Sequence, residues 1–301
     1  MSGIRPAARS HLYVPGDRPD VLAKALGRGA DALLIDLEDA VAPAAKPEAR
    51  RIVAEFLAAQ ANSASGVSGF ASSSSVELWV RVNAGSMAVV DIEAVASPAL
   101  AGFCIAKTES VDEVRAADDA CAAAESGLGL EAGHFALAPL LESASAVLDA
   151  RAIAAASPRV SRLQVGEADL RADIGVELSA DERELLFVRS SIVLASAAAG
   201  IEPPVGPVST NFTNLDALRE STLALKRLGY RGRACIHPAQ AAVVNDVFTP
   251  TDSELTAATR LVELFEEAQS RGDGVFTDDN GRMVDIAVIR AARRTLSLAR
   301  P

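Results

Sequence analysis

Three carboxylates interrupt an apolar run in the segment LLIDLEDAV, residues 33–41. Asp36, Glu38 and Asp39 follow residues that would otherwise continue a buried strand. Because burying an unpaired carboxylate costs several kcal/mol, an ordinary core strand does not keep such residues. We therefore expect these acids to end a strand and to meet cations, either on other side chains or at a bound metal ion.

Polar residues also end most of the other apolar runs of the chain. These residues are Arg81, Asn83, Lys107, Glu109, Glu142, Glu167, Asp169 and His237. In a barrel of parallel strands the C-terminal strand ends meet at one mouth, which is where such folds carry out chemistry. A network of strand-end salt bridges is the structural alternative for any single residue, but the complete set favours a functional site.

Two acids among them suggest a metal ion. Glu142 and Asp169 are expected to end the fifth and sixth strands, each after a nearly continuous apolar run, with no His or Cys beside them. Hard oxygen donors of this kind suit Mg²⁺, which keeps several water ligands and takes one or two protein carboxylates. The sequence therefore predicts a magnesium site on this pair.

Lys107 admits two interpretations. A lysine at a barrel mouth could form a Schiff base with a carbonyl substrate. With several acids expected nearby, an ion-pair partner that keeps its charge is the favoured interpretation.

Eight apolar runs alternate with amphipathic, helix-like segments. The expected strands lie at residues 11–14, 32–36, 77–83, 102–107, 134–142, 162–169, 203–209 and 233–238. Eight such units in series, with strands too apolar to expose either face, predict an α/β fold of the (β/α)₈ TIM-barrel type. A doubly wound open sheet is the alternative.

The chain continues beyond what eight units need. We expect a catalytic barrel domain over residues 1–248 and a C-terminal extension over 249–301, with a helix over 252–270, a hairpin and a last helix ending at Leu298. Such an extension is expected to act as a lid or as a segment exchanged between subunits. Asp285, just before the last helix, could also cap it. A Ser/Gly-rich loop is expected at 62–75.

Composition limits the function classes. The 301 residues carry a net charge of −11 and no Lys/Arg cluster, so no nucleic-acid partner is expected. Three scattered cysteines show neither metal-ligand nor disulfide spacing, which favours the cytoplasm. The N-terminus lacks a signal-peptide pattern, and the longest apolar-rich run falls short of the roughly 20 residues that span a bilayer, so no membrane partner is expected.

A set of motifs then carries a family resemblance. The stretches RSHLYVPGDRPDVLAKAL, DALLIDLEDAVAPAAK, VRVN, LLESASAVLDA, VGEADLRADIG, ACIHPAQ and GRMVD follow one another in order from about Arg9 to Leu298. Together they resemble the citrate lyase beta-subunit-like proteins of the HpcH/HpaI aldolase family, beside the malyl-CoA and citramalyl-CoA lyases.

The resemblance implies a Mg²⁺-dependent barrel that cleaves or forms a carbon–carbon bond next to a CoA thioester. It places the metal on Glu142 and Asp169 and a substrate-binding arginine at Arg81. It places the CoA contacts on an aromatic, an arginine and a lysine of the first unit, which are Tyr13, Arg18 and Lys24. It also implies that Asp285 reaches the active site of a neighbouring subunit, so a homo-oligomer, specifically a homotrimer, is expected.

The implied reaction is cleavage of a 3-hydroxyacyl-CoA, such as malyl-, citramalyl- or citryl-CoA, to acetyl-CoA or propionyl-CoA and a 2-oxo acid. Asp36, Glu38 and Asp39 are then expected to orient Arg81 and Lys107, with Glu38 nearest the reacting groups. Three alternatives stay open: a subunit acting on a carrier-bound citryl group, a malate-synthase-like condensing enzyme, and a non-catalytic binding barrel. Ala106, where relatives usually have proline, and a seventh strand without an aspartate often seen there depart from the family pattern.

Overall fold

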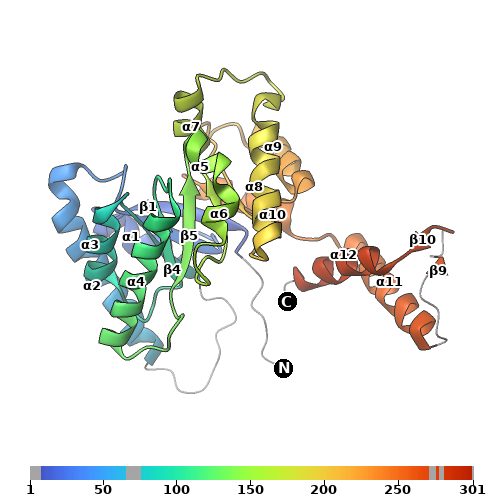
Figure 1. The fold of residues 1–301 in the computed structure, drawn as a ribbon, viewed down its shortest axis with the longest axis horizontal. Helices are drawn as coiled ribbons and strands as arrows, with labels where there is room; N and C mark the ends of the chain where they lie inside the picture. Colours follow the sequence, from blue (N-terminus) through green and yellow to red (C-terminus); the bar gives the residue numbers. More distant parts are fainter. Residues whose placement is uncertain (1–7, 66–75, 271–275, 278–280, 300–301) are drawn as a thin grey trace. The chain divides into compact units, whose positions relative to one another are not determined.

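The structure is a computed structural model that describes residues 8–65, 76–270, 276–277 and 281–299. Eight parallel strands close into a barrel in the order of the sequence, β1 to β8 (Figure 1), which confirms the predicted TIM-barrel fold. The strands are β1 (Ser10–Pro15), β2 (Ala32–Asp36), β3 (Glu77–Val82), β4 (Gly102–Ile105), β5 (Ala136–Leu141), β6 (Gln164–Val165), β7 (Val205–Gly206) and β8 (Gly232–Cys235).

Helices connect the strands and cover the barrel. They are α1 (Pro19–Ala25), α2 (Lys46–Ser65), α3 (Ser86–Val95), α4 (Val111–Leu128), α5 (Ala144–Leu148), α6 (Ala150–Ala154), α7 (Glu167–Ile174), α8 (Leu186–Ala199), α9 (Leu215–Leu228) and α10 (Pro238–Phe248). Helices α2, α3 and α4 lie side by side along one flank of the barrel (Figure 1). None of the described helices is long and apolar enough to cross a membrane.

The strands are buried on both faces, as a parallel sheet covered by helices requires. Every residue of β2 and β4 is buried. Inside the barrel a core cluster contains Leu34, Trp79, Cys104 and Leu140, which come from four different strands. This packing explains why the sequence shows continuous apolar runs rather than alternation.

Local signals in the sequence set the limits of α4. Ser110 and Glu113 form a reciprocal capping box, in which each side chain accepts a hydrogen bond from the other residue's backbone N–H. Gly129 ends the helix with a φ of 66°, a left-handed conformation that glycine adopts without a steric penalty.

The region after β5 departs from the expected elements. The prediction that Asp169 ends the sixth strand is wrong, because β6 stops at Val165 and Asp169 lies in the first turn of α7. Gly166 lies between the strand and the helix, where the chain turns. Of the loop expected at 62–75, residues 62–65 belong to α2, and 66–75 lie outside the described residues.

Residues from Asp246 onward form a second compact unit, separate from the unit Ala8–Asn245. It contains α11 (Asp252–Ser270), the antiparallel pair β9 (Phe276–Thr277) and β10 (Met283–Val284), and α12 (Ile286–Ser297). Phe265, Val284 and Ile289 form its small core. The expected hairpin and final helix are therefore present, whereas the assignment of residues 1–248 and 249–301 to separate functional domains stays a prediction.

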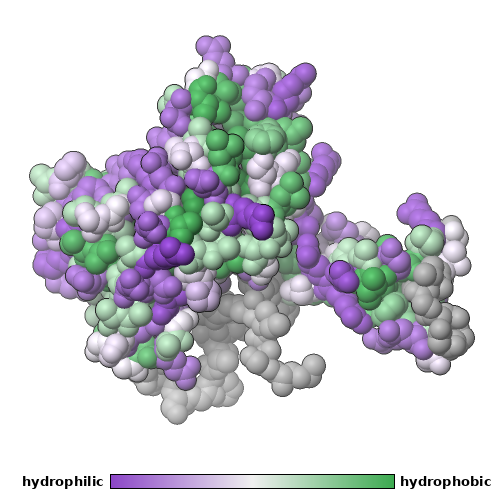
Figure 2. Space-filling view, in the orientation of Figure 1, coloured by the Kyte–Doolittle hydropathy of each residue, from purple (hydrophilic) through white to green (hydrophobic). Residues whose placement is uncertain are grey.

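Helix α8 exposes large apolar side chains on its outer face. Leu186, Phe187 and Leu194 are 51%, 71% and 69% exposed. Figure 2 shows hydrophobic residues gathered along this helix. An exposed apolar stripe of this kind is characteristic of surfaces that meet another molecule.

Candidate active site

Asp36 and Arg81 form a buried ion pair at the mouth of the barrel. The pairing of β2 with β3 places the two residues directly opposite each other. Nε and Nη2 of Arg81 donate to the two carboxylate oxygens of Asp36 at 2.7 and 2.6 Å. The same carboxylate accepts hydrogen bonds from the backbone N–H groups of Glu38 and Ala40. This bidentate contact fixes the plane of the guanidinium.

Glu38 and Asp39 connect this pair to Lys107. Glu38 lies 3.2 Å from Nη1 of Arg81 and also accepts a hydrogen bond from Lys107, while Asp39 accepts one from Lys107 at 3.1 Å. Burial opposes the charge of Lys107, but the bonds to both acids outweigh it and raise the lysine pKa above its usual value. Lys107 therefore occurs as an ion-pair partner, in agreement with the favoured interpretation. It holds a φ of 47°, an unusual conformation for a side-chain-bearing residue.

Glu142 lies at the mouth and forms no ion pair with any of the described residues. It directly follows β5 and is buried, and its Oε2 has no hydrogen-bond partner among the described residues. Burial, and then the nearby charge of Asp169, raise the pKa of Glu142 to about 8. A carboxylate in this situation would be stabilised by a bound cation.

Gly166 makes room for this carboxylate. A Cβ at Gly166 would clash with Cγ, Cδ and Oε1 of Glu142. The strand-to-helix turn therefore passes against the side chain of Glu142 and then leads into the first turn of α7, which carries Asp169. This turn therefore leaves room for one predicted metal ligand and leads to the other.

A cavity of about 380 Å³ brings these groups together. Its lining includes Asp36, Arg81, Glu142 and Asp169. Tyr13 from β1 also lines it, with the guanidinium carbon of Arg81 4.9 Å from the centre of its ring. The structure thus brings the two metal candidates and Arg81 to one cavity at the C-terminal end of the barrel.

The residues of this cavity fit a magnesium ion. Glu142 offers an unpartnered, buried oxygen, Asp169 supplies a second carboxylate, and both are hard oxygen donors. Among the described residues there is no group of three or more His, Cys, Asp or Glu residues arranged to hold a metal ion. A site with two carboxylates suits Mg²⁺ because this ion completes its shell with water and substrate oxygens.

A second cavity, of about 420 Å³, adjoins the first. Tyr13 and Ile236 line both, and Lys24, Arg28 and His237 line the second alone. Arg28 was not among the residues predicted to contact CoA. It follows Lys24 by four residues, a spacing that would have suggested that both lie on the same face of a helix.

Arg18 and Asp285 each make local contacts within their own unit. Arg18 is more than half exposed and pairs with Asp20 at 3.1 Å, and it is absent from the lining of the second cavity. Asp285 lies in the second unit, where its Oδ1 accepts hydrogen bonds from the backbone N–H groups of Ala287 and Val288. It therefore caps α12, as the structural alternative predicted.

The sequence also missed two residues that shape the mouth. Gln164 of β6 donates a hydrogen bond from Nε2 to the hydroxyl of Tyr13 at 2.9 Å and so holds that ring in place. Gly166 is the second. Its signal was present, since a glycine directly after an apolar strand often marks a close approach of the backbone to another group.

Comparison with known proteins gives consistent matches. The family model described as HpcH/HpaI aldolase/citrate lyase matches residues 9–238. The citrate lyase subunit beta of Haemophilus influenzae is 32% identical over 294 residues, covering 97% of each chain. The L-malyl-CoA/beta-methylmalyl-CoA lyase of Rhodobacter capsulatus is 32% identical over 311 residues, covering 94% of this chain and 92% of its own.

A solved structure is similar over nearly the same length. It is the protein CitE from Mycobacterium tuberculosis in complex with magnesium, acetoacetate and coenzyme A. The TM-score is 0.72 at 29% sequence identity, covering 97% of this chain and 98% of CitE.

Proposed function

The chain belongs to the HpcH/HpaI aldolase/citrate lyase family, and from this we propose that it is a Mg²⁺-dependent carbon–carbon lyase of CoA thioesters. Its substrate is a 3-hydroxyacyl-CoA such as malyl-, citramalyl- or citryl-CoA. The products are acetyl-CoA or propionyl-CoA and a 2-oxo acid. The names of the relatives support a lyase, and the cavity at the barrel mouth supports the assignment of the groups.

The observation that carries the proposal is the state of Glu142. A buried carboxyl with an unpartnered oxygen, beside a second acid, is costly to keep unless a cation binds there. Asp36, by contrast, has both oxygens satisfied by Arg81 and backbone N–H groups. Glu142 and Asp169 are therefore the ligands we assign to Mg²⁺.

The cleavage breaks the bond between C2 and C3 of the acyl group. The C3 hydroxyl loses its proton to become the carbonyl of the 2-oxo acid, and the bond electrons pass to C2 as the thioester enolate, which then takes up a proton. Bound Mg²⁺ supplies Lewis-acid polarisation of substrate oxygens. Arg81, held rigid by Asp36 and steadied by Glu38, offers fixed donors to the substrate carboxylate or to the enolate oxygen.

The second cavity is the proposed site of the CoA moiety. Lys24 and Arg28 supply positive charge for its phosphates, and Tyr13, shared with the mouth cavity, marks the path of the thioester toward Glu142. Arg18, though paired with Asp20, lies at the start of the same helix and is the third proposed phosphate contact. Removing Lys24 is expected to raise KM with a smaller change in kcat.

Asp285 is proposed to act in the active site of a neighbouring subunit. The family resemblance gives it the proton-transfer role, and the exposed apolar residues of α8 support assembly of several copies, here a homotrimer. Mixing inactive Asp285→Asn and Glu142→Ala subunits should restore part of the activity, because some sites then pair an intact copy of each residue. An active monomer, or no rescue despite proven subunit exchange, would contradict this assignment.

The proposal as a whole is tested by an acyl-CoA panel. Purified protein with Mg²⁺ is offered malyl-, methylmalyl-, citramalyl- and citryl-CoA, and the 2-oxo acid and the shortened acyl-CoA are followed by mass spectrometry. We expect one or more of these thioesters to be cleaved, with the activity lost in EDTA and restored by Mg²⁺. Absence of both cleavage and the reverse condensation would reject the function.

Similarity to a citrate lyase subunit favours a second candidate. The Haemophilus influenzae relative is a subunit of citrate lyase, so this chain could act on a citryl group attached to a carrier protein. Adding citryl-carrier protein to the same panel separates the two, since the carrier substrate would be cleaved faster than free citryl-CoA only in the second case.

The compartment we propose is the cytoplasm. Cys104, Cys121 and Cys235 are all buried and free. Unpaired cysteines are compatible with the reducing conditions of that compartment.

A further inference from the structure

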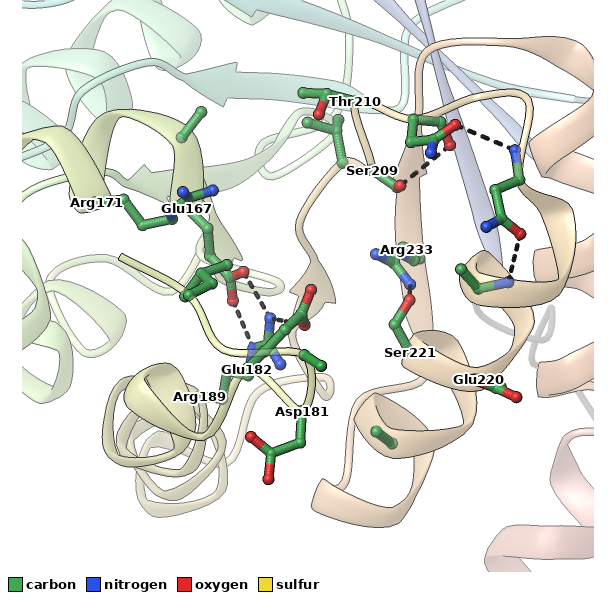
Figure 3. A pocket seen from close by; sticks show the side chains of 18 residues that line it. Glu167, Arg171, Asp181, Glu182, Arg189, Ser209, Thr210, Glu220, Ser221 and Arg233 are labelled. Atoms are coloured by element: carbon green, nitrogen blue, oxygen red, sulfur yellow. Dashed lines mark hydrogen bonds and ion pairs between the residues drawn. The ribbon is translucent and has the colours of Figure 1, made fainter. Parts of the chain in front are cut away.

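A third cavity, of about 590 Å³, lies beside the mouth and plays no part in the proposed lyase reaction (Figure 3). Its walls come from α7, from the segment that precedes α8, from the segment after β7 and from α9. Cavities of a few hundred Å³ with a few convergent polar groups are the usual binding sites for small molecules.

Arg233 of β8 forms one wall and carries a buried charge. The residue is 3% exposed, and its Nε and Nη1 donate to neutral oxygens only, chiefly those of Pro207, Ser221 and Thr222 at 2.7–2.9 Å. Among the described residues it has no carboxylate partner, and its Nη2 has no hydrogen-bond acceptor. Burial lowers the pKa of Arg233. A buried guanidinium of this kind is normally balanced by an anion.

Arg171 faces the same space from the opposite side. Figure 3 shows it on the α7 side of the cavity and Arg233 on the β8 side. The Nε of Arg171 is buried and has no hydrogen-bond partner among the described residues. Two arginines with unused donors thus line one cavity, together with hydroxyl groups such as those of Ser209 and Thr210.

The acids of this cavity are already paired or lie at its exposed edge. Glu167 and Glu182 both bind Arg189, at 2.6–2.7 Å. Asp181 pairs with Arg183 at 3.1 Å, and Glu220 is exposed. Glu182 holds a φ of 51°, an unfavourable conformation for a residue with a side chain, and such strain is concentrated at functional sites.

We infer that this cavity binds a small organic monocarboxylate, held by Arg233 and Arg171. The planar guanidinium matches a carboxylate, and the hydroxyl groups match a hydroxyl or carbonyl group on the same ligand. The paired acids still repel added negative charge, so one carboxylate fits the cavity better than a dianionic phosphate. This assignment stands on the cavity alone and does not depend on the lyase reaction.

The cavity also has a route to the proposed metal site. Glu167 and Ala168 line both this cavity and the one at the mouth, and they lie in the same first turn of α7 as Asp169. A bound carboxylate therefore lies against the helix turn that carries a metal ligand. We expect its binding to change the affinity for Mg²⁺, and Mg²⁺ to change its affinity by the same factor.

The test measures binding to the otherwise unchanged protein by calorimetry in EDTA, which removes any metal ion from the mouth. The probes are lactate and pyruvate, with methyl pyruvate as the neutral control and inorganic phosphate as the competing anion. The blocking variant is Ala224→Leu, because Ala224 is an exposed helix residue that lines the cavity. Ala123→Leu, on the exposed face of α4, is the matched control.

We expect lactate or pyruvate to bind at one site with a Kd of a few millimolar or lower. Ala224→Leu and Arg171→Met should each weaken binding at least about tenfold, while Ala123→Leu leaves it unchanged. Both test variants alter positions that are not fully buried, so both are expected to fold, and the test needs no substitution of the buried Arg233. Absence of binding, unchanged affinity in Ala224→Leu, or equal or tighter binding of phosphate or the neutral ester would each overturn the assignment.

Discussion

Two charged clusters lie at opposite ends of the barrel, one at the mouth and one at the N-terminal strand ends. In the second, Arg159 pairs with Asp118 and Glu125 at 2.5 Å. Glu125 also accepts hydrogen bonds from the backbone N–H groups of Gly133 and Phe135, just before β5. Burial alone would raise the pKa of Glu125, but Arg159 and these backbone groups lower it to about 2.

At the mouth, Glu142 has the opposite shift and an unpartnered oxygen. The pKa of Glu125 therefore lies below the usual value for glutamate, and the pKa of Glu142 lies above it. This difference follows from the hydrogen-bond and ion-pair partners of the two acids. Glu125 has a complete set of donors within the protein. In the part of the chain that the structure describes, Glu142 has none for Oε2, which leaves this oxygen available to a ligand. The comparison indicates that a saturated cluster stabilises the fold, whereas an unsaturated one is available for binding.

The largest expected effect comes from a substitution of Glu142 at the mouth of the barrel. Glu142→Gln should lower kcat/KM by about 10⁴-fold, or about 5 kcal/mol, because it removes the charge that we propose as a Mg²⁺ ligand. The free energy of unfolding should change by less than about 1 kcal/mol, since the acid contributes little to the metal-free fold. Enzyme kinetics and urea unfolding with EDTA measure the two. If Glu142→Gln strongly lowered the free energy of unfolding, Glu142 would have a structural role like that of Glu125.

The second largest effect is expected from a substitution of Arg159, in the cluster at the N-terminal ends of the strands. Arg159→Met leaves Glu125 and Asp118 without their cation and should lower the free energy of unfolding by about 3–5 kcal/mol. The activity per folded molecule should stay unchanged, because this cluster is remote from the mouth. Urea titration and active-site-normalised kinetics check both. If Arg159→Met instead lowered kcat and left the free energy of unfolding unchanged, the cluster around Arg159 would not be purely structural.

A smaller effect is expected from a residue at the mouth that is fully paired. Asp36→Asn replaces one of the two acceptors of Arg81 by an amide, so the guanidinium loses its fixed orientation. We expect kcat/KM to fall by about 10²-fold while Mg²⁺ affinity stays nearly constant. Calorimetry with Mg²⁺ alone provides the control, and a parallel loss of metal affinity would mean that Asp36 belongs to the metal site.

The smallest effect depends on pH. Because the folded pKa of Glu125 is depressed to about 2, its stabilising contribution is complete above the unfolded value near 4.5 and is lost as pH falls toward 2. Glu125→Gln should therefore be less stable than the wild type by about 1.5–3 kcal/mol at pH 7. That difference should shrink between pH 4.5 and 2. A difference in urea midpoints that is constant across this range would contradict the proposed charge pairing.

Much of the fold was predictable because parallel strands buried on both faces leave continuous apolar runs. Helix α7 was missed because Leu170 and Ile174 are its only large apolar residues, too few to give a helical period. As a result Asp169 was assigned to a strand that in fact ends four residues earlier.

The site was predictable where strand register determines it. Asp36 and Arg81 meet because neighbouring strands pair them, and the excess of acids after β2 indicated a cationic partner. The left-handed backbone of Lys107 and the cavity between Arg171 and Arg233 were not predictable. Both depend on how segments far apart in the chain pack, which leaves no short-range pattern.

Gly166 has a consequence for genetics. Its φ of −108° is open to any residue, and the atoms nearest to an added methyl group all belong to the side chain of Glu142. Gly166→Ala should therefore yield a folded but inactive protein, because the new methyl group displaces the carboxylate. Shortening the acid by Glu142→Asp would keep Cγ, which lies 2.5 Å from the new methyl group, so this second mutation should not restore activity. Selection for revertants of Gly166→Ala should therefore return glycine at position 166 rather than a change elsewhere in the barrel.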